Sequence, residues 1–289
     1  MKKFAFLAVL VALAVNAASV WAVDAESLEK AGAKVRLNAD GAVIVVDARN
    51  AEGFTGAELA DLPALKDLKL NGAQVTDATL PNLASFQALT SLALDKTAIT
   101  DATLEKVAQL PALAQLFLAE TAVTDAGAAR LDLGRFTRLR LAGTKITDAT
   151  LAKLAASEKL QVLDVSNTAV TTAGAVAVSK VKTLVDVNFY STRVDDGACE
   201  SLGKMAQLQK LNLDNTAVTD AGVAQLEGLE NLEFLHLGRT AMTDACIPSI
   251  LKLKNLKTIH VTRTQITPEG AEKLRVGLPG CNVISVVQE

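Results

Sequence analysis

The most regular chemical feature of this 289-residue chain is a row of seven aspartates. They recur every 24 residues, with one interval of 23 and one place, taken by Thr172, where the aspartate is missing: Asp77, Asp101, Asp125, Asp148, Asp196, Asp220 and Asp244. A row of carboxylates could bind calcium, which gathers about six to eight oxygen ligands at one point. Because the spacing supplies only about one carboxylate per period, we expect no metal site in this row.

Capping of helices explains the row better. Near the end of the chain the aspartate is replaced by Pro268, a residue favoured at the first helical position, which places Thr267 at the N-cap. By analogy we predict a series of threonine helix caps: Thr76, Thr100, Thr124, Thr147, Thr219, Thr243 and Thr267. The aspartates would then lie in the first helical turn, where the helix dipole stabilises a negative charge by roughly 0.3–1 kcal/mol.

The two histidines, His236 and His260, are also 24 residues apart and should lie side by side in adjacent periods. Two imidazoles could share a zinc ion or couple binding of a partner to pH. Zinc needs three or four ligands, and only Asp214 is within reach as a third. We expect a polar surface, a partner contact or a pH-sensitive contact, and neither a metal nor another cofactor.

No sequence motif of a known active site accompanies these residues. The chain has no G-x-S-x-G, no glycine-rich phosphate loop, no H-E-x-x-H and no cysteine with an evident partner base. We therefore predict a protein that is not an enzyme.

The elements that position these residues follow from the hydrophobic pattern. In one period Leu211 and Leu213 alternate with polar residues, which predicts a short strand, and Val223 and Leu226 then fall on one face of a helix. The pattern L-x-x-L-x-L-x-x-T, clearest over residues 89–97, recurs with a period of about 24, as in leucine-rich repeats. Stacked repeats share one continuous core, so we expect a single elongated domain.

The chain resembles exported bacterial leucine-rich-repeat proteins whose repeat reads L-x-x-L-x-L-x-x-T-x-[IV]-T-D-A-G-L. Its repeats are also similar to those of F-box-associated receptor arms. The resemblance implies an α/β solenoid, or horseshoe, with a parallel β-sheet on the concave face and short helices on the convex face. It implies a curved binding scaffold and no reaction.

Four segments are expected along the chain. Residues 1–22 predict a signal peptide, residues 23–64 an N-terminal cap with a β-hairpin and a degenerate first repeat, residues 65–281 nine repeats, and residues 282–289 a C-terminal cap strand. Export to the periplasm or the extracellular space follows, without a stable membrane anchor after cleavage. The whole chain has a net charge of −3, and losing Lys2 and Lys3 would make it more acidic, so nucleic acid is not an expected partner.

The concave face is where we expect a partner to bind. Exposed aromatic and arginine residues dominate interface hot spots, and the predicted binding residues are Phe117, Arg138, Arg140, Asp186, Tyr190, Lys210, Asp214, Phe234, His236, Arg239, His260 and Arg263. We predict a protein or peptide ligand. The alternative is a glycan or cell-wall polymer held by aromatic, asparagine and aspartate side chains.

Overall fold

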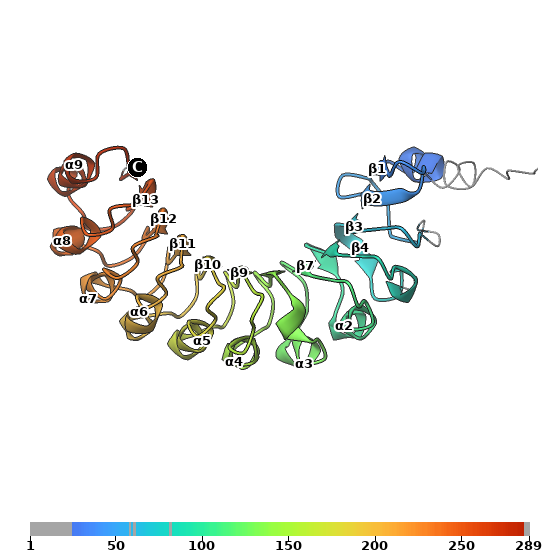
Figure 1. The fold of residues 1–289 in the computed structure, drawn as a ribbon, viewed down its shortest axis with the longest axis horizontal. Helices are drawn as coiled ribbons and strands as arrows, with labels where there is room; N and C mark the ends of the chain where they lie inside the picture. Colours follow the sequence, from blue (N-terminus) through green and yellow to red (C-terminus); the bar gives the residue numbers. More distant parts are fainter. Residues whose placement is uncertain (1–24, 58, 60–61, 81–82, 286–289) are drawn as a thin grey trace, which may run out of the picture.

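The computed structural model describes residues 25–57, 59, 62–80 and 83–285. They form one curved solenoid, with strands along the inner side of the arc and helices along the outer side (Figure 1). The predicted signal peptide, residues 1–22, lies outside the described residues, as do the last four residues of the predicted C-terminal cap strand. The predicted fold class, a leucine-rich-repeat solenoid with a parallel sheet on its concave face, is confirmed.

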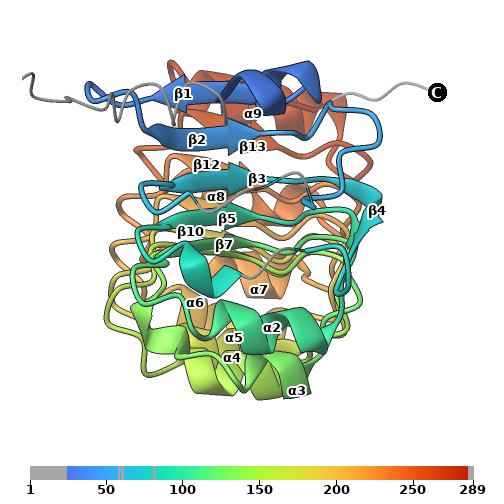
Figure 2. The same ribbon diagram turned by 90° about the vertical axis from the view of Figure 1, so that its right-hand side faces the viewer.

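The inner side of the arc is one continuous β-sheet (Figure 2). Among the described residues it has twelve strands, parallel except for the first pair: β1 (Lys34–Leu37), β2 (Val43–Asp47), β3 (Asp67–Lys69), β5 (Ser91–Ala93), β7 (Gln115–Phe117), β8 (Arg138–Arg140), β9 (Val162–Asp164), β10 (Asp186–Asn188), β11 (Lys210–Asn212), β12 (Phe234–His236), β13 (Thr258–His260) and β14 (Asn282–Ile284). A smaller sheet pairs β4 (Gly72–Thr76) with β6 (Thr97–Ala98).

The convex side carries one short helical element for most repeats. These are η1 (Leu83–Ser85), α2 (Asp101–Val107), α3 (Asp125–Ala128), η2 (Leu133–Arg135), α4 (Asp148–Leu154), α5 (Thr172–Val178), α6 (Asp196–Leu202), α7 (Asp220–Ala224), η3 (Asp244–Cys246), α8 (Ile247–Ile250) and α9 (Pro268–Gly277), and residues 25–30 are also helical. Within the described ranges no helix is long and apolar enough to cross a membrane.

Strand alternation sorts the side chains into a core and a surface. The middle residue of each three-residue strand, such as Leu211, is buried, whereas the first and third face the concave side. Paired strands keep equivalent residues opposite one another, for example Asn212 with His236 and His236 with His260. Concave side chains therefore form straight columns that run across the strands at intervals of about 4.8 Å.

A left-handed residue turns the chain out of the sheet three residues after most strands. Seven non-glycine residues have φ between 53° and 60° there: Lys96, Glu120, Asn167, Ser191, Asn215, Arg239 and Arg263. The threonine that follows donates its hydroxyl to the carbonyl three residues earlier, as Thr97 does to Leu94 at 2.7 Å. The turn thus has its own hydrogen bond while its backbone lies in a region unfavourable for side chains other than glycine.

The corner threonines cap helices, and the recurring aspartates join one repeat to the next. Thr124, for example, accepts a hydrogen bond from Ala126 N and so caps α3. Its own N–H and hydroxyl donate to the two carboxylate oxygens of Asp101, at 2.8 and 2.6 Å. The same double contact links seven pairs: Asp77–Thr100, Asp101–Thr124, Asp125–Thr147, Asp148–Thr171, Asp196–Thr219, Asp220–Thr243 and Asp244–Thr267. We call these contacts the Asp–Thr ladder.

One rung of the ladder has its two residue types exchanged. Thr172 stands in the aspartate place and Asp195 in the threonine place, and the hydroxyl of Thr172 donates to Asp195 Oδ1 at 2.6 Å. Asp195 N donates back to Thr172 Oγ1 at 3.0 Å, and Asp195 caps α6 through Gly197 N. The contact between repeats is therefore kept with its polarity reversed.

Thr76 differs from the prediction that it caps a helix. It is the last residue of β4, and residues 77–79 form a turn. Its hydroxyl accepts a hydrogen bond from Thr79 N at 3.2 Å, so it closes that turn instead. Thr243 is also a cap, but of the 3-10 helix η3 and not of an α-helix.

The N-terminal edge of the sheet is closed by an antiparallel hairpin. β1 pairs with β2, and Asn38 Oδ1 accepts from both Asp40 N and Ala42 N to hold the connecting turn. β1 itself is largely exposed and carries Lys34 and Arg36, charges of the kind that discourage edge-to-edge association.

Candidate functional site

The concave face brings the predicted binding residues onto one surface. The structure places Arg138, Asp186, Lys210 and Phe234 in the column of first strand residues, and Phe117, Arg140, His236 and His260 in the column of third residues. Tyr190 and Asp214 follow two residues after their strands, and Arg239 and Arg263 lie on the left-handed turns. We divide this surface into a C-terminal group around Asp214 and a central group around Arg140.

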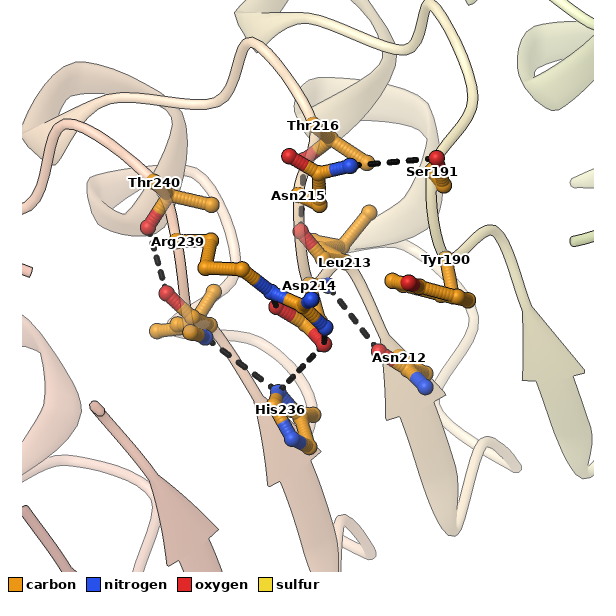
Figure 3. Close-up of polar contacts among 12 residues, drawn as sticks. Tyr190, Ser191, Asn212, Leu213, Asp214, Asn215, Thr216, His236, Arg239 and Thr240 are labelled. Atoms are coloured by element: carbon orange, nitrogen blue, oxygen red, sulfur yellow. Dashed lines mark hydrogen bonds and ion pairs between the residues drawn. The ribbon is translucent and has the colours of Figure 1, made fainter. Parts of the chain in front are cut away.

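The C-terminal group is centred on an ion pair between the buried Asp214 and the exposed Arg239 (Figure 3). Asp214 is only 4% exposed, and both of its carboxylate oxygens accept from Arg239, Oδ1 from Nε at 2.9 Å and Oδ2 from Nη2. The carboxylate raises the pKa of the Arg239 guanidinium. The guanidinium also lies over the ring of Tyr190, with Cζ 4.9 Å from the ring centroid, a cation–π arrangement. Two residues expected to contact a partner separately therefore neutralise each other.

The two histidines are stacked next to this ion pair. Their ring centroids are 4.3 Å apart with an interplanar angle of 9°, and Phe234 lies 5.5 Å from His260. His236 Nδ1 accepts from Gly238 N at 3.2 Å and is 3.8 Å from Asp214 Oδ2. Burial lowers the pKa of both histidines, so both imidazoles are neutral at pH 7.

The stacked imidazoles do not form part of a metal centre in the described chain. No group of three or more histidine, cysteine, aspartate or glutamate side chains there is close enough to hold a metal ion. The carboxylates of the Asp–Thr ladder are occupied by N–H and hydroxyl donors. At Asp125, burial by itself raises the pKa, but hydrogen bonds from Thr150 and Thr147 outweigh it and lower the pKa.

The central group contains a second charge network. Arg140 lies between two carboxylates, 3.3 Å from Asp95 Oδ2 through Nη1 and 3.4 Å from Asp164 Oδ2 through Nε. Asp186 faces Lys210 at 3.8 Å. Burial raises the pKa of both Asp95 and Asp186. Asp95 and Asp164 were not among the predicted site residues, although Asp164 lies opposite Arg140 in the same column of third strand residues, which indicates such a contact.

Comparison with known proteins agrees with this geometry. The family model described as "Leucine Rich repeat" matches residues 156–179 and 252–274. None of the curated proteins matches the sequence. Among solved structures, an internalin (inlF) from Listeria monocytogenes superposes with a TM-score of 0.61 at 18% identity, covering 81% of this chain and 64% of that protein. Internalin C2 from the same organism gives 0.55 at 21% identity, covering 71% of this chain and 84% of that protein.

These similarities bear on fold. The chain spans less than two thirds of the inlF structure, and the identities are low, so they show a common architecture and no common ligand. Three observations indicate the same leucine-rich-repeat architecture. They are the repeat matches at two places, the twelve-stranded sheet in the described residues and the helices on its outer side. The chain folds as a leucine-rich-repeat solenoid, a horseshoe similar in architecture to the two internalin structures.

Proposed function

We propose that this protein is an exported, non-enzymatic scaffold that holds a protein or peptide partner on its concave sheet. The observation that carries the proposal is the set of partly exposed aromatic side chains on that sheet: Phe117 on β7, Tyr190 after β10 and Phe234 on β12. Aromatic residues set among arginines supply most of the binding energy at protein interfaces. Because the backbone hydrogen bonds of the sheet are already formed, little ordering of the receptor opposes binding.

The reactive groups of the described residues support a binding role over a catalytic one. Cys199 and Cys246 are buried, and burial raises the pKa of each thiol to about 12, so neither supplies a thiolate at neutral pH. Both histidines are stacked on each other. Export remains a proposal based on the apolar stretch from Phe4 to Val15 and the two lysines that precede it.

Affinity capture from the cell envelope tests this proposal. The concave variant combines Phe234→Ala with Arg263→Glu, two changes that leave the Asp214–Arg239 ion pair intact. The matched convex variant combines Val276→Ala with Lys273→Glu on α9, where Val276 is 74% exposed. We expect the unmodified protein and the convex variant to capture the same protein and the concave variant to lose it. Equal capture by all three would refute a concave binding face.

A further inference from the structure

A hollow lies at the C-terminal ends of β12 and β13. It has a volume of about 280 Å³ and is lined by Asp214, His236, Arg239, Thr262 and Arg263. Gly238 makes room for it, because the equivalent places in neighbouring repeats carry Tyr190, Asp214 and Thr262. A Cβ atom on Gly238 would lie 2.9 Å from His236 Cε1, 3.0 Å from Thr262 Oγ1 and 3.1 Å from Asp214 Oδ1.

The hollow has an excess positive charge in an acidic protein. Asp214 is neutralised by Arg239, and both histidines are neutral at pH 7 because burial lowers their pKa. Arg263 is exposed, and its side chain has no hydrogen bond or ion pair with other residues that the structure describes. Arg239 keeps Nη1 free of its bidentate contact with Asp214. Two guanidiniums on adjacent turns, of which only Arg239 is paired with a carboxylate, favour a further carboxylate.

An aromatic surface extends from the hollow along the same two strands. Phe234 and His260 lie 5.5 Å apart at ring centroids, and His236 continues the stack toward the hollow. Gly238 is four positions beyond Phe234, and four residues of extended chain span about 13 Å at 3.3 Å per residue. An extended ligand places side chains i and i+4 on one face at the same separation.

We propose that this strip binds an extended segment of a protein partner lying along β12 and β13. The segment presents an aromatic or large apolar side chain to Phe234 and His260 and, four residues away, a glutamate or aspartate side chain to Arg263 and the free edge of Arg239. This assignment rests on the proposed function and specifies the partner's chemistry. The bidentate geometry of a guanidinium with a carboxylate gives the specificity, and the aromatic contact gives most of the buried apolar area.

Short capped peptides test the assignment without knowledge of the partner. The probes are acetylated, amidated pentapeptides with tryptophan and glutamate at opposite ends of Ser-Gly-Ser, made in both orders. The measurement is the NMR shift of arginine Nε–H and histidine ring signals in the protein up to about 10 mM peptide, a range suited to weak ligands. We expect one order to shift the Arg263 and His260 signals, with binding at least about fivefold weaker when glutamine replaces glutamate.

The matched variants are Arg263→Gln and Arg193→Gln. Arg193 is also exposed and loses the same charge, but it lies outside the strip, at an isolated β-bridge with Thr171. We expect Arg263→Gln to weaken binding of the glutamate peptide at least about fivefold and Arg193→Gln to leave it unchanged. Phe234→Ala should weaken both the glutamate and the glutamine peptides.

Three results would overturn the assignment. The first is no shift with either order of peptide, and the second is equal binding of the glutamate and glutamine peptides. The third is that a glutamine peptide with a free C-terminal carboxylate binds as well as the glutamate peptide. That result would make the chain terminus the source of the charge. If the peptides fail while the concave variant still loses its captured partner, the scaffold function stands and Phe234 or Arg263 contacts that partner, but the partner is not an extended segment with an aromatic and an acidic side chain four residues apart. If the peptides bind but capture is unaffected, the scaffold proposal fails separately.

Discussion

Asp125→Ala should destabilise the fold about twice as much as Asp101→Ala. Asp125 accepts four hydrogen bonds from the next repeat, from Thr147 N and Oγ1 at 3.0 and 2.7 Å and from Thr150 N and Oγ1 at 3.2 and 2.5 Å. Asp101 accepts two, both from Thr124. Each backbone amide that loses a charged acceptor costs about 1–1.5 kcal/mol when water replaces it in part. We therefore expect losses of about 3 and about 1.5 kcal/mol, because the helix-dipole effect is common to both.

A swap of residue types tests whether the contact itself causes the loss. Asp101→Thr combined with Thr124→Asp reproduces the reversed pair that Thr172 and Asp195 already form. Each single change leaves two like partners facing each other, so the double variant should recover about 1–2 kcal/mol relative to the sum of the single changes. The assay is urea unfolding followed by circular dichroism at neutral pH, with the exposed Glu230→Gln as a control for charge alone. Additive single effects, or equal losses for the two aspartates, would refute the ladder as the source of stability between repeats.

Three further outcomes follow from the concave face and its turns. Arg239→Ala leaves the carboxylate of Asp214 buried without a cation and should lower the free energy of unfolding in urea by about 2–3 kcal/mol. Adding Asp214→Asn to the same chain should restore part of that free energy. No loss would mean that water replaces the guanidinium. NMR titration should give pKa values for His236 and His260 below the usual value. Their contribution to stability should be complete above about pH 6.5 and lost as pH falls through the folded-state pKa values, because protonation then favours the unfolded chain. Unshifted pKa values would contradict their burial. Lys96→Gly should raise the free energy of unfolding by about 0.5–1 kcal/mol, since glycine adopts the φ of 60° without strain; a decrease would show that unfolded-state entropy dominates.

The sequence predicted the architecture because each repeat follows the same rule. Alternating leucines indicated the strands and the concave columns, and Pro268, in the place of the recurring aspartate, identified the helix N-cap. These signals are local, within about ten residues, and they were repeated often enough to be read reliably.

The role of the aspartates was predicted only in part, because their partners lie 22 to 26 residues away. Nothing within a single repeat indicates which neighbour accepts or donates. Two signals were present in the sequence, the first being the exchange of Thr172 and Asp195. The second is the residue three places after each cap, which is glycine at Gly127 because a Cβ there would lie 2.1 Å from Asp101 Oδ1, and threonine at Thr103 where a hydroxyl donates to Asp77.

The pairing of Asp214 with Arg239 also escaped prediction from the pattern. Both residues were placed on the concave surface, but the left-handed turn at Arg239, with φ of 53°, directs its side chain back over the preceding strand. The repeat pattern gives the position of a residue on the sheet but not the direction of its side chain. The prediction therefore treated Asp214 and Arg239 as two separate charges, whereas in the folded chain they form one neutral pair. Arg263 is then the distinctive cation of this region.

The Asp–Thr ladder also determines how arrays of this kind can change in length. A typical repeat carries a threonine that faces the previous unit and an aspartate that faces the next, so duplicating or deleting a whole unit leaves every junction with one acceptor and one donor. The exchanged pair is the exception. Removing the unit that begins at Thr171 would bring Asp148 against Asp195, two carboxylates at one junction. Recombination during evolution can therefore add or remove repeats on either side of the exchanged pair. The two repeats that carry Thr172 and Asp195 must be inherited together.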